Sequence, residues 1–178
     1  MKKFFLFVFL TIFCVVALAY IASPSCTKVN MPVEGATANS YNPKAFWCPW
    51  GDHHHHGVDI FAKVGTPVHP ARAGVVIWIT NNNGRGGNTV SIMDYSGTIY
   101  YYAHLNTINV VMGDIVTSTS TIGTVGKTGN AANTPAHLHF SMMSIWPKFH
   151  TTSEYDSWVN YDSDTKYFFY DPAKVLKN

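Results

Sequence analysis

The sequence predicts an all-β protein: a compact antiparallel β-sheet domain that follows an N-terminal hydrophobic export segment. Three observations support this fold class. Short β-rich runs alternate with Gly, Asn and Asp turns from residue 58 onward. Beyond the first apolar run, no stretch keeps the 3.6-residue apolar period of an amphipathic helix. That first run is itself long and uninterrupted by polar residues, as an export signal is.

Length and composition exclude several classes of protein. The 178 residues allow one domain with its own core. Aromatic residues make up 15% of the chain and apolar residues 47%, which excludes a disordered protein. A net charge of +2 is too small for a nucleic-acid binder that works through bulk positive charge. With 3 Cys the chain has too few cysteines for a disulfide-dense scaffold. The unusual feature of the composition is its 9 His, in a chain with only 12% charged residues.

The N-terminus is typical of an export signal. Lys2 and Lys3 precede the apolar run 4–22, and residues 17–19 form an Ala-Leu-Ala cleavage candidate. The run is also long enough to span a bilayer, so residues 1–22 are expected to be a signal peptide or an uncleaved signal anchor. This segment would be the chain's only membrane contact. Either way, we expect the remainder in the periplasm or cell envelope, or secreted.

Residues 23–50 are expected to form an irregular arm, because proline recurs at positions 24, 32, 43 and 49. Two properties of the arm stay open. Cys26 and Cys48 could form a disulfide in an oxidising compartment. The arm could also lie over a substrate groove and inhibit it, with Asn30, Asn39 or Asn42 reaching a bound metal.

The remaining residues, 51–178, are expected to form the β domain. Predicted strands span residues 58–62, 74–79, 88–93, 98–103, 114–116, 122–125 and 138–142. Each run is rich in β-branched or aromatic residues and is followed by turn residues. Asp94–Gly97 lies between two such runs and indicates a hairpin. Residues 145–170 form an aromatic insertion whose role the sequence leaves open.

Two histidine clusters carry the candidate chemistry. The first is the tract His53–His56, which leads into Asp59, and the second is His137 with His139. Residues two or four apart in a strand share a face, so His55 with Asp59, and His137 with His139, are expected to share faces. Two imidazoles and one carboxylate are ligands that a catalytic zinc ion uses, with the fourth position left to water.

A further histidine is placed to transfer protons. His104 directly follows the aromatic run 100–102, at the end of a predicted strand. A histidine beside a metal-activated water can accept or donate a proton because its pKa lies near neutrality.

In these residues the chain resembles the lysostaphin- and LytM-type zinc metallopeptidases, peptidase family M23. The resemblance covers about residues 52–143 and residues 170–172. Its blocks occur in the family's order, at residues 55–60, 65–68, 73–76, 87–90, 102–105, 113–116, 122–129 and 137–140. The loops 117–120 and 130–136 depart from the family's usual glycine-containing pattern, which leaves substrate preference open but removes no ligand.

The resemblance implies one zinc ion per chain, held by His55, Asp59 and His139. His53 is the alternative ligand, because strand alternation also places it on the face of Asp59, whereas His54 and His56 should face away. The resemblance further implies that His104 and His137 are the non-ligand catalytic histidines, one a base and one a transition-state stabiliser. The implied activity is hydrolysis of peptide bonds in bacterial cell-wall peptidoglycan, by a monomer that binds no nucleic acid.

Two other functions compete with this one. A non-catalytic module of the same family would bind the wall or activate another hydrolase, although all five key positions are filled here. A metal-sequestering protein would use the tract His53–His56 to bind several metal ions per chain. The bond that an active enzyme would cleave, a D-amino-acid cross-link or a glycine-rich bridge, is not decided by any residue pattern.

Overall fold

A computed structural model describes residues 28–50, 53–144, 159–162 and 167–176. The export segment 1–22 and the proposed Cys26–Cys48 disulfide therefore fall outside the described residues. Among the residues that are described, no helix combines the length and the apolar character needed to cross a membrane.

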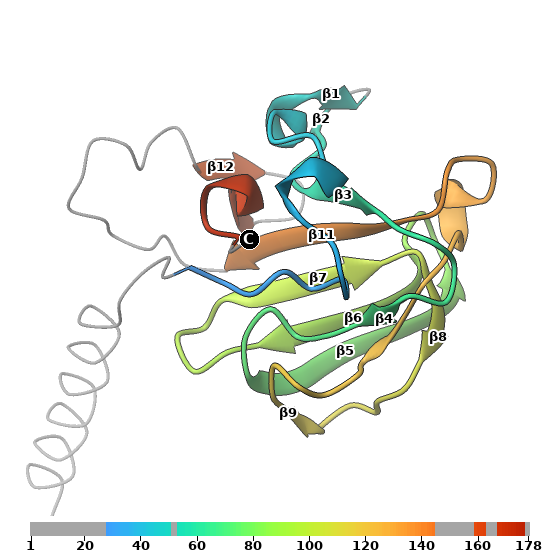
Figure 1. Ribbon diagram of the computed structural model, residues 1–178. Helices are drawn as coiled ribbons and strands as arrows, with labels where there is room; N and C mark the ends of the chain where they lie inside the picture. The colour runs from blue at the N-terminus through green and yellow to red at the C-terminus, as the bar shows by residue number, and fades with distance from the viewer. Residues whose placement is uncertain (1–27, 51–52, 145–158, 163–166, 177–178) are drawn as a thin grey trace, which may run out of the picture.

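A curved antiparallel sheet of eight strands forms the frame of the domain (Figure 1). Its order is β12-β13-β11-β7-β6-β5-β9, and β3 pairs with β11. The strands are β3 (Val58–Phe61), β5 (Gly74–Asn83), β6 (Gly87–Met93), β7 (Ile99–Ala103), β9 (Ile115–Val116), β11 (His137–Ser144), β12 (Val159–Asp162) and β13 (Tyr167–Tyr170). The expected antiparallel β fold is confirmed.

Smaller elements cover and flank this sheet. A three-stranded sheet has the order β4 (Pro67–Val68), β10 (Gly123–Val125), β8 (Leu105–Ile108), and β1 (Pro49–Trp50) pairs with β2 (His53–His54). Four 3₁₀ turns are described: η1 (Ala38–Ser40), η2 (Ala45–Trp47), η3 (Gly129–Ala131) and η5 (Pro172–Lys174). Sequence patterns missed β4 and β8 because β4 has two residues and the middle of β8 is polar and exposed.

The arm and the aromatic insertion both contribute to the folded domain. Val29 and Val33 are each 1% exposed and belong to the main core. Val29 bridges to Leu176, and Val33 bridges to Val68 of β4. Within the insertion, β13 pairs with β11 and so extends the large sheet; residues 145–158 and 163–166 lie outside the described part of the chain.

Strand alternation gives the large sheet two different faces. The core face carries apolar side chains that pack against the small sheet and residues 29–33. They include Val58, Ile60, Val90, Ile92, Tyr100, Tyr102, Leu138, Phe140 and Met142, each at most 1% exposed. The residues between them point to the opposite face. On β11 these are His137, His139, Ser141 and Met143, so the histidines lie on the side away from the core.

The hairpin expected at residues 94–97 joins β6 to β7, and Asp94 holds it together. Asp94 Oδ1 accepts hydrogen bonds from the backbone N–H groups of Ser96 and Thr98 at 2.9 and 3.0 Å and from the Ser96 hydroxyl at 2.6 Å. Asp94 Oδ2 accepts one from the buried Tyr100 hydroxyl at 3.1 Å. All four groups are buried, so losing the acceptor leaves several donors unpaired.

Asp94→Ala is therefore expected to lower the free energy of unfolding by about 2–4 kcal/mol, measured by urea denaturation. Asp114→Ala is the matched control, because its carboxylate accepts a single exposed backbone N–H, from Val111. Its expected cost is below about 1 kcal/mol. Equal costs for the two variants would contradict the role given to Asp94.

Candidate metal centre and catalytic site

The pairing of β3 with β11 brings together two of the expected metal ligands. In the register of the two strands, His139 lies directly opposite Asp59, and His137 lies opposite Phe61. Directly opposed side chains lie on the same face with their Cβ atoms about 5 Å apart. Asp59 and His139 are therefore neighbours although 80 residues separate them in the chain.

His55 reaches the same point by a different route from the one expected. It does not lie on a strand with Asp59, because β2 ends at His54 and β3 begins at Val58. The strand-alternation argument for His55 was therefore wrong. His55 sits in a loop held by the arm, through a 2.9 Å hydrogen bond from its backbone N–H to the Cys48 carbonyl.

Glycine at position 57 allows this loop to lie against β11. A Cβ atom there would lie 2.6 Å from Ser141 Oγ, 2.7 Å from the Phe140 carbonyl oxygen and 2.8 Å from His139 Cε1. All three contacts belong to β11, the strand that carries His139. Any side chain at position 57 would push His55 away from its partners.

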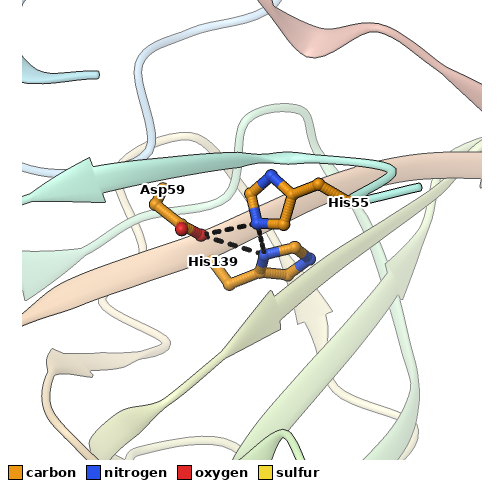
Figure 2. Close-up of side chains that lie close together, drawn as sticks. All are labelled: His55, Asp59 and His139. Carbon is orange, nitrogen blue, oxygen red and sulfur yellow. Dashed lines mark hydrogen bonds and ion pairs between the residues drawn. The ribbon is translucent and has the colours of Figure 1, made fainter. Parts of the chain in front are cut away.

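Three ligand atoms converge, as Figure 2 shows. His55 Nε2 lies 3.1 Å from Asp59 Oδ1, and His139 Nδ1 lies 3.0 Å from both of these atoms. A tetrahedral zinc ion with bonds of about 2.0–2.1 Å sets its ligand atoms about 3.3 Å apart, so the triangle has nearly the size that zinc requires. Two imidazole nitrogens and a carboxylate oxygen are also the donor set that a catalytic zinc site uses.

Ser141 orients the His139 ring. Its hydroxyl oxygen lies 2.9 Å from His139 Nε2. When Nε2 carries the ring proton and donates it to Ser141, Nδ1 presents its lone pair to the other two ligand atoms. We did not expect this role for Ser141 from the sequence, although its spacing of two from His139 on one strand is a usable signal.

The neighbours of His55 in the histidine tract, His54 and His56, are not part of the triangle, although both line the cavity next to it. His54 is exposed and makes an edge-on ring contact with Trp47, at 5.4 Å between centroids. His56 is buried and stacks on Phe169, with centroids 4.3 Å apart. The side chain of His53, the alternative ligand, falls outside what the structure describes.

The two expected proton carriers lie beside the triangle, with their rings 5.0 Å apart between centroids. His104 follows β7 in a left-handed conformation with a φ of 63°, and its Nδ1 lies 3.0 Å from the Thr128 carbonyl oxygen. His137 Nδ1 lies 2.8 Å from the Pro135 carbonyl oxygen. A carbonyl only accepts hydrogen bonds, so each Nδ1 carries a proton, and each Nε2 is left for other partners. His137 Nε2 is 3.8 Å from Asp59 Oδ1.

In the metal-free protein, the electrostatics of the site favour an ionised Asp59 and neutral rings at His139 and His104. Burial alone would raise the pKa of Asp59, but hydrogen bonds from His139 and His55 outweigh it and lower that pKa well below its usual range. Burial lowers the pKa of His139. Burial, reinforced by His139 and His137, lowers the pKa of His104 to about 4. Neutral imidazoles are the form that binds metals and accepts protons.

The depressed pKa of His104 predicts a pH dependence of stability in the chelator-treated protein. His104 binds its proton at about pH 4 when folded and at 6.5 when unfolded, so the unfolded state holds more protons between these values. The free energy of unfolding is expected to fall as pH drops through this window, by about 1–3 kcal/mol from His104. Urea titrations of wild type and His104→Asn measure it, and identical pH slopes would contradict the assignment.

A large cavity adjoins the metal triangle on the exposed face of the sheet. Its volume is about 620 Å³, and its lining includes His55, His139, Tyr101 and Trp78. Phe169, Met143 and Ile99 line it, and their cross-strand partners Met93, Val75 and Ile115 continue this apolar row beyond the cavity, across six strands in all. The groove beside the metal ligands is therefore apolar and aromatic, and we did not identify this row from the sequence.

Two smaller pockets flank the triangle. One, of about 160 Å³, is lined by His104, Arg85 and Asn130 as well as by His55 and His139. The other, of about 200 Å³, is lined by Asn42 together with His55 and Asp59. Of the three asparagines considered for autoinhibition, Asn42 is thus the one that borders the ligands, and inhibition by the arm stays a prediction.

Comparison with known proteins gives a consistent result. A sequence model of peptidase family M23 matches residues 53–153. Lysostaphin of Staphylococcus simulans is 38% identical over 90 residues, which are 50% of this chain and 18% of lysostaphin. Peptidoglycan DD-endopeptidase ShyA of Vibrio cholerae is 36% identical over 89 residues, 50% of this chain and 20% of ShyA. The chain thus spans about a fifth of the length of each.

A solved structure shares the fold of this domain. A zinc-containing peptidase from Vibrio cholerae is 29% identical and superposes with a TM-score of 0.52, covering 65% of this chain and 36% of that one. The likeness therefore extends beyond single motifs to the fold.

Proposed function

The chain belongs to peptidase family M23, and we propose that it is a zinc metalloendopeptidase that hydrolyses peptide bonds in bacterial cell-wall peptidoglycan. The observation that carries this proposal is the triangle of His55, Asp59 and His139, whose ligand atoms lie 3.0–3.1 Å apart at the end of an open cavity. We assign one zinc ion to these three residues. When bound, zinc acts as a Lewis acid that lowers the pKa of a water molecule and polarises a carbonyl group.

The histidines beside the triangle supply the proton transfers of this proposal. His104 is neutral near pH 7 because burial lowers its pKa, so its Nε2 can accept the proton of the attacking water. His137 projects from the same strand face as His139. Because its Nδ1 proton is taken by the Pro135 carbonyl, His137 acts in this step as an imidazolium, whose Nε2–H donates to the negative charge that develops on the carbonyl oxygen. The carbonyls of Thr128 and Pro135 fix both rings through Nδ1.

Substrate and location follow from the relatives by analogy. Lysostaphin and the DD-endopeptidase ShyA support peptidoglycan as the substrate, and an exported protein would meet it in the cell envelope. We propose export through residues 1–22, with membrane contact through that segment alone when it is uncleaved, and a monomer. The cleaved bond, a direct cross-link or a bridge, is left to experiment.

Digestion of purified walls tests the proposed function. The full chain is incubated with directly cross-linked and with glycine-bridged peptidoglycan, with and without a chelator, and the fragments are identified by mass spectrometry. We expect peptide fragments from at least one wall type, no release with chelator, and recovery on adding zinc. A zinc-loaded protein that releases nothing from either wall would favour the non-catalytic binding module instead.

A further inference from the structure

The small pocket beside His104 has a chemical character that the rest of the groove lacks. Arg85 and Asn130 line it together with His104 and the two histidine ligands. Among the described residues that line the three cavities around the triangle, Arg85 is the only lysine or arginine. The larger cavity has no charged residue in its described lining apart from the histidines.

The backbone that carries Arg85 is tied to the catalytic site. The Gly86 carbonyl accepts a 2.9 Å hydrogen bond from the backbone N–H of His104. The Arg85 carbonyl accepts one of 2.9 Å from the N–H of Asn130. The β5–β6 turn and the loop at η3 are thus hydrogen-bonded to each other and to His104. These bonds fix the backbone position from which the Arg85 side chain extends.

Glycines make this close fit possible. Gly129 has a φ of 64°, and a Cβ atom there would collide with the Arg85 carbonyl oxygen. Gly87 has a φ of 66°, and a Cβ atom there would collide with Thr128 and Gly129. Two segments 40 residues apart therefore meet backbone to backbone, and they form one wall of the pocket.

Arg85 is exposed and has no partner carboxylate within ion-pair distance among the residues the structure describes. Its guanidinium presents a planar set of donors that matches a carboxylate better than any neutral group. Asn130, on the adjoining loop, offers an amide that can also donate. The pocket is therefore suited to an anion bound next to the reacting bond.

We propose that Arg85 is a specificity-determining residue that binds a free carboxylate of the peptide substrate beside the scissile bond. This inference rests on the proposed function and deepens it. It assigns the enzyme to peptides that carry carboxylates near the cleaved bond and disfavours uncharged glycine-rich bridges. The larger apolar cavity, which adjoins this pocket at Tyr101, takes the uncharged part of the same substrate.

The test compares one substrate with and without its charges. Dimeric peptide fragments are isolated from a directly cross-linked wall and used as free acids or after amidation of their carboxylates. For wild type we expect kcat/KM to be about tenfold higher on the free acid than on the amidated form. This ratio corresponds to the lower end of the free-energy range for hydrogen bonds to charged groups, which we choose because Arg85 is exposed to solvent. Arg85→Gln should bring this ratio close to one, chiefly through KM, and Arg85→Lys should retain part of it.

Lys63→Gln is the matched control, because it removes one positive charge as Arg85→Gln does. Lys63 is exposed and lines none of the three cavities. This variant should keep the wild-type ratio. Higher salt should lower the ratio in wild type and leave Arg85→Gln unaffected. A ratio in Arg85→Gln equal to that of wild type would overturn the inference.

Binding separates this inference from the proposed function. Dissociation constants for both fragment forms are measured by calorimetry with zinc-loaded His104→Ala, with and without Arg85→Gln. We expect Arg85→Gln to weaken binding of the free acid about tenfold and to leave the amidated form unchanged. Absence of cleavage by wild type with this binding pattern intact would refute the hydrolase and keep the carboxylate site. Cleavage by wild type, with equal binding of both fragment forms in the presence and absence of Arg85→Gln, would refute the carboxylate site and keep the hydrolase.

Discussion

His139→Ala is expected to lose its zinc ion and at least about a thousandfold of its hydrolytic activity. His139 Nδ1 is 3.0 Å from both other ligand atoms, so its removal leaves two ligands where a catalytic site needs three. Asp59→Ala should behave in the same way. Zinc content is measured by mass spectrometry of the metal, activity on purified walls, and folding by circular dichroism.

The control for this prediction lies in the histidine tract. Replacing His54 and His56 together should leave one zinc ion per chain, because His54 contacts Trp47 and His56 stacks on Phe169. A metal-sequestering protein would instead bind several ions and lose most of them in this double variant. Full zinc content and full hydrolysis in His139→Ala would exclude the proposed ligand set.

The sheet could be predicted where local signals agree. The hairpin at residues 94–97 joins β6 to β7 as expected, because its turn residues and both flanking β-rich runs indicate the same structure. Strands β4 and β8 lack such signals. Their pairing with β10 depends on tertiary contacts, and the exposed residues of β8, Asn106 and Thr107, give no apolar alternation.

The candidate ligand set could be named from motifs, whereas its geometry could not. Asp59 and His139 meet only because β3 and β11 pair in one register, and no local pattern reports a contact across 80 residues. His55 shows the limit more sharply. Its spacing of four from Asp59 suggested a shared strand face, yet the loop reaches the site because Gly57 fits against β11.

The apolar cavity and the Arg85 pocket could not be predicted for a related reason. Each is assembled from side chains of several strands or loops whose individual positions look ordinary in sequence. Arg85 is one exposed residue in a glycine-rich turn. Arg85 lies beside the candidate site only because backbone hydrogen bonds join this turn to His104 and to Asn130.

His104→Ala is expected to separate catalysis from metal binding. The variant should keep one zinc ion, because His104 is not part of the triangle, and lose about 10²–10⁴-fold in kcat, the usual value of a positioned general base. His137→Ala should show a comparable loss with zinc retained. Wall digestion and zinc content measured on the same samples provide the test.

The environment of His104 also predicts which role it has. Burial lowers its pKa to about 4, so at neutral pH the ring is unprotonated: it can accept a proton, although as a weaker base than an ordinary histidine, and it has no extra proton to donate as an acid. A base of this kind should be partly rescued in His104→Ala by added imidazole, which supplies a proton acceptor of ordinary pKa. Loss of zinc from His104→Ala would instead make His104 a structural support of the ligands. Unchanged kcat in a zinc-loaded variant would remove it from the mechanism and leave His137 as the residue that moves the proton.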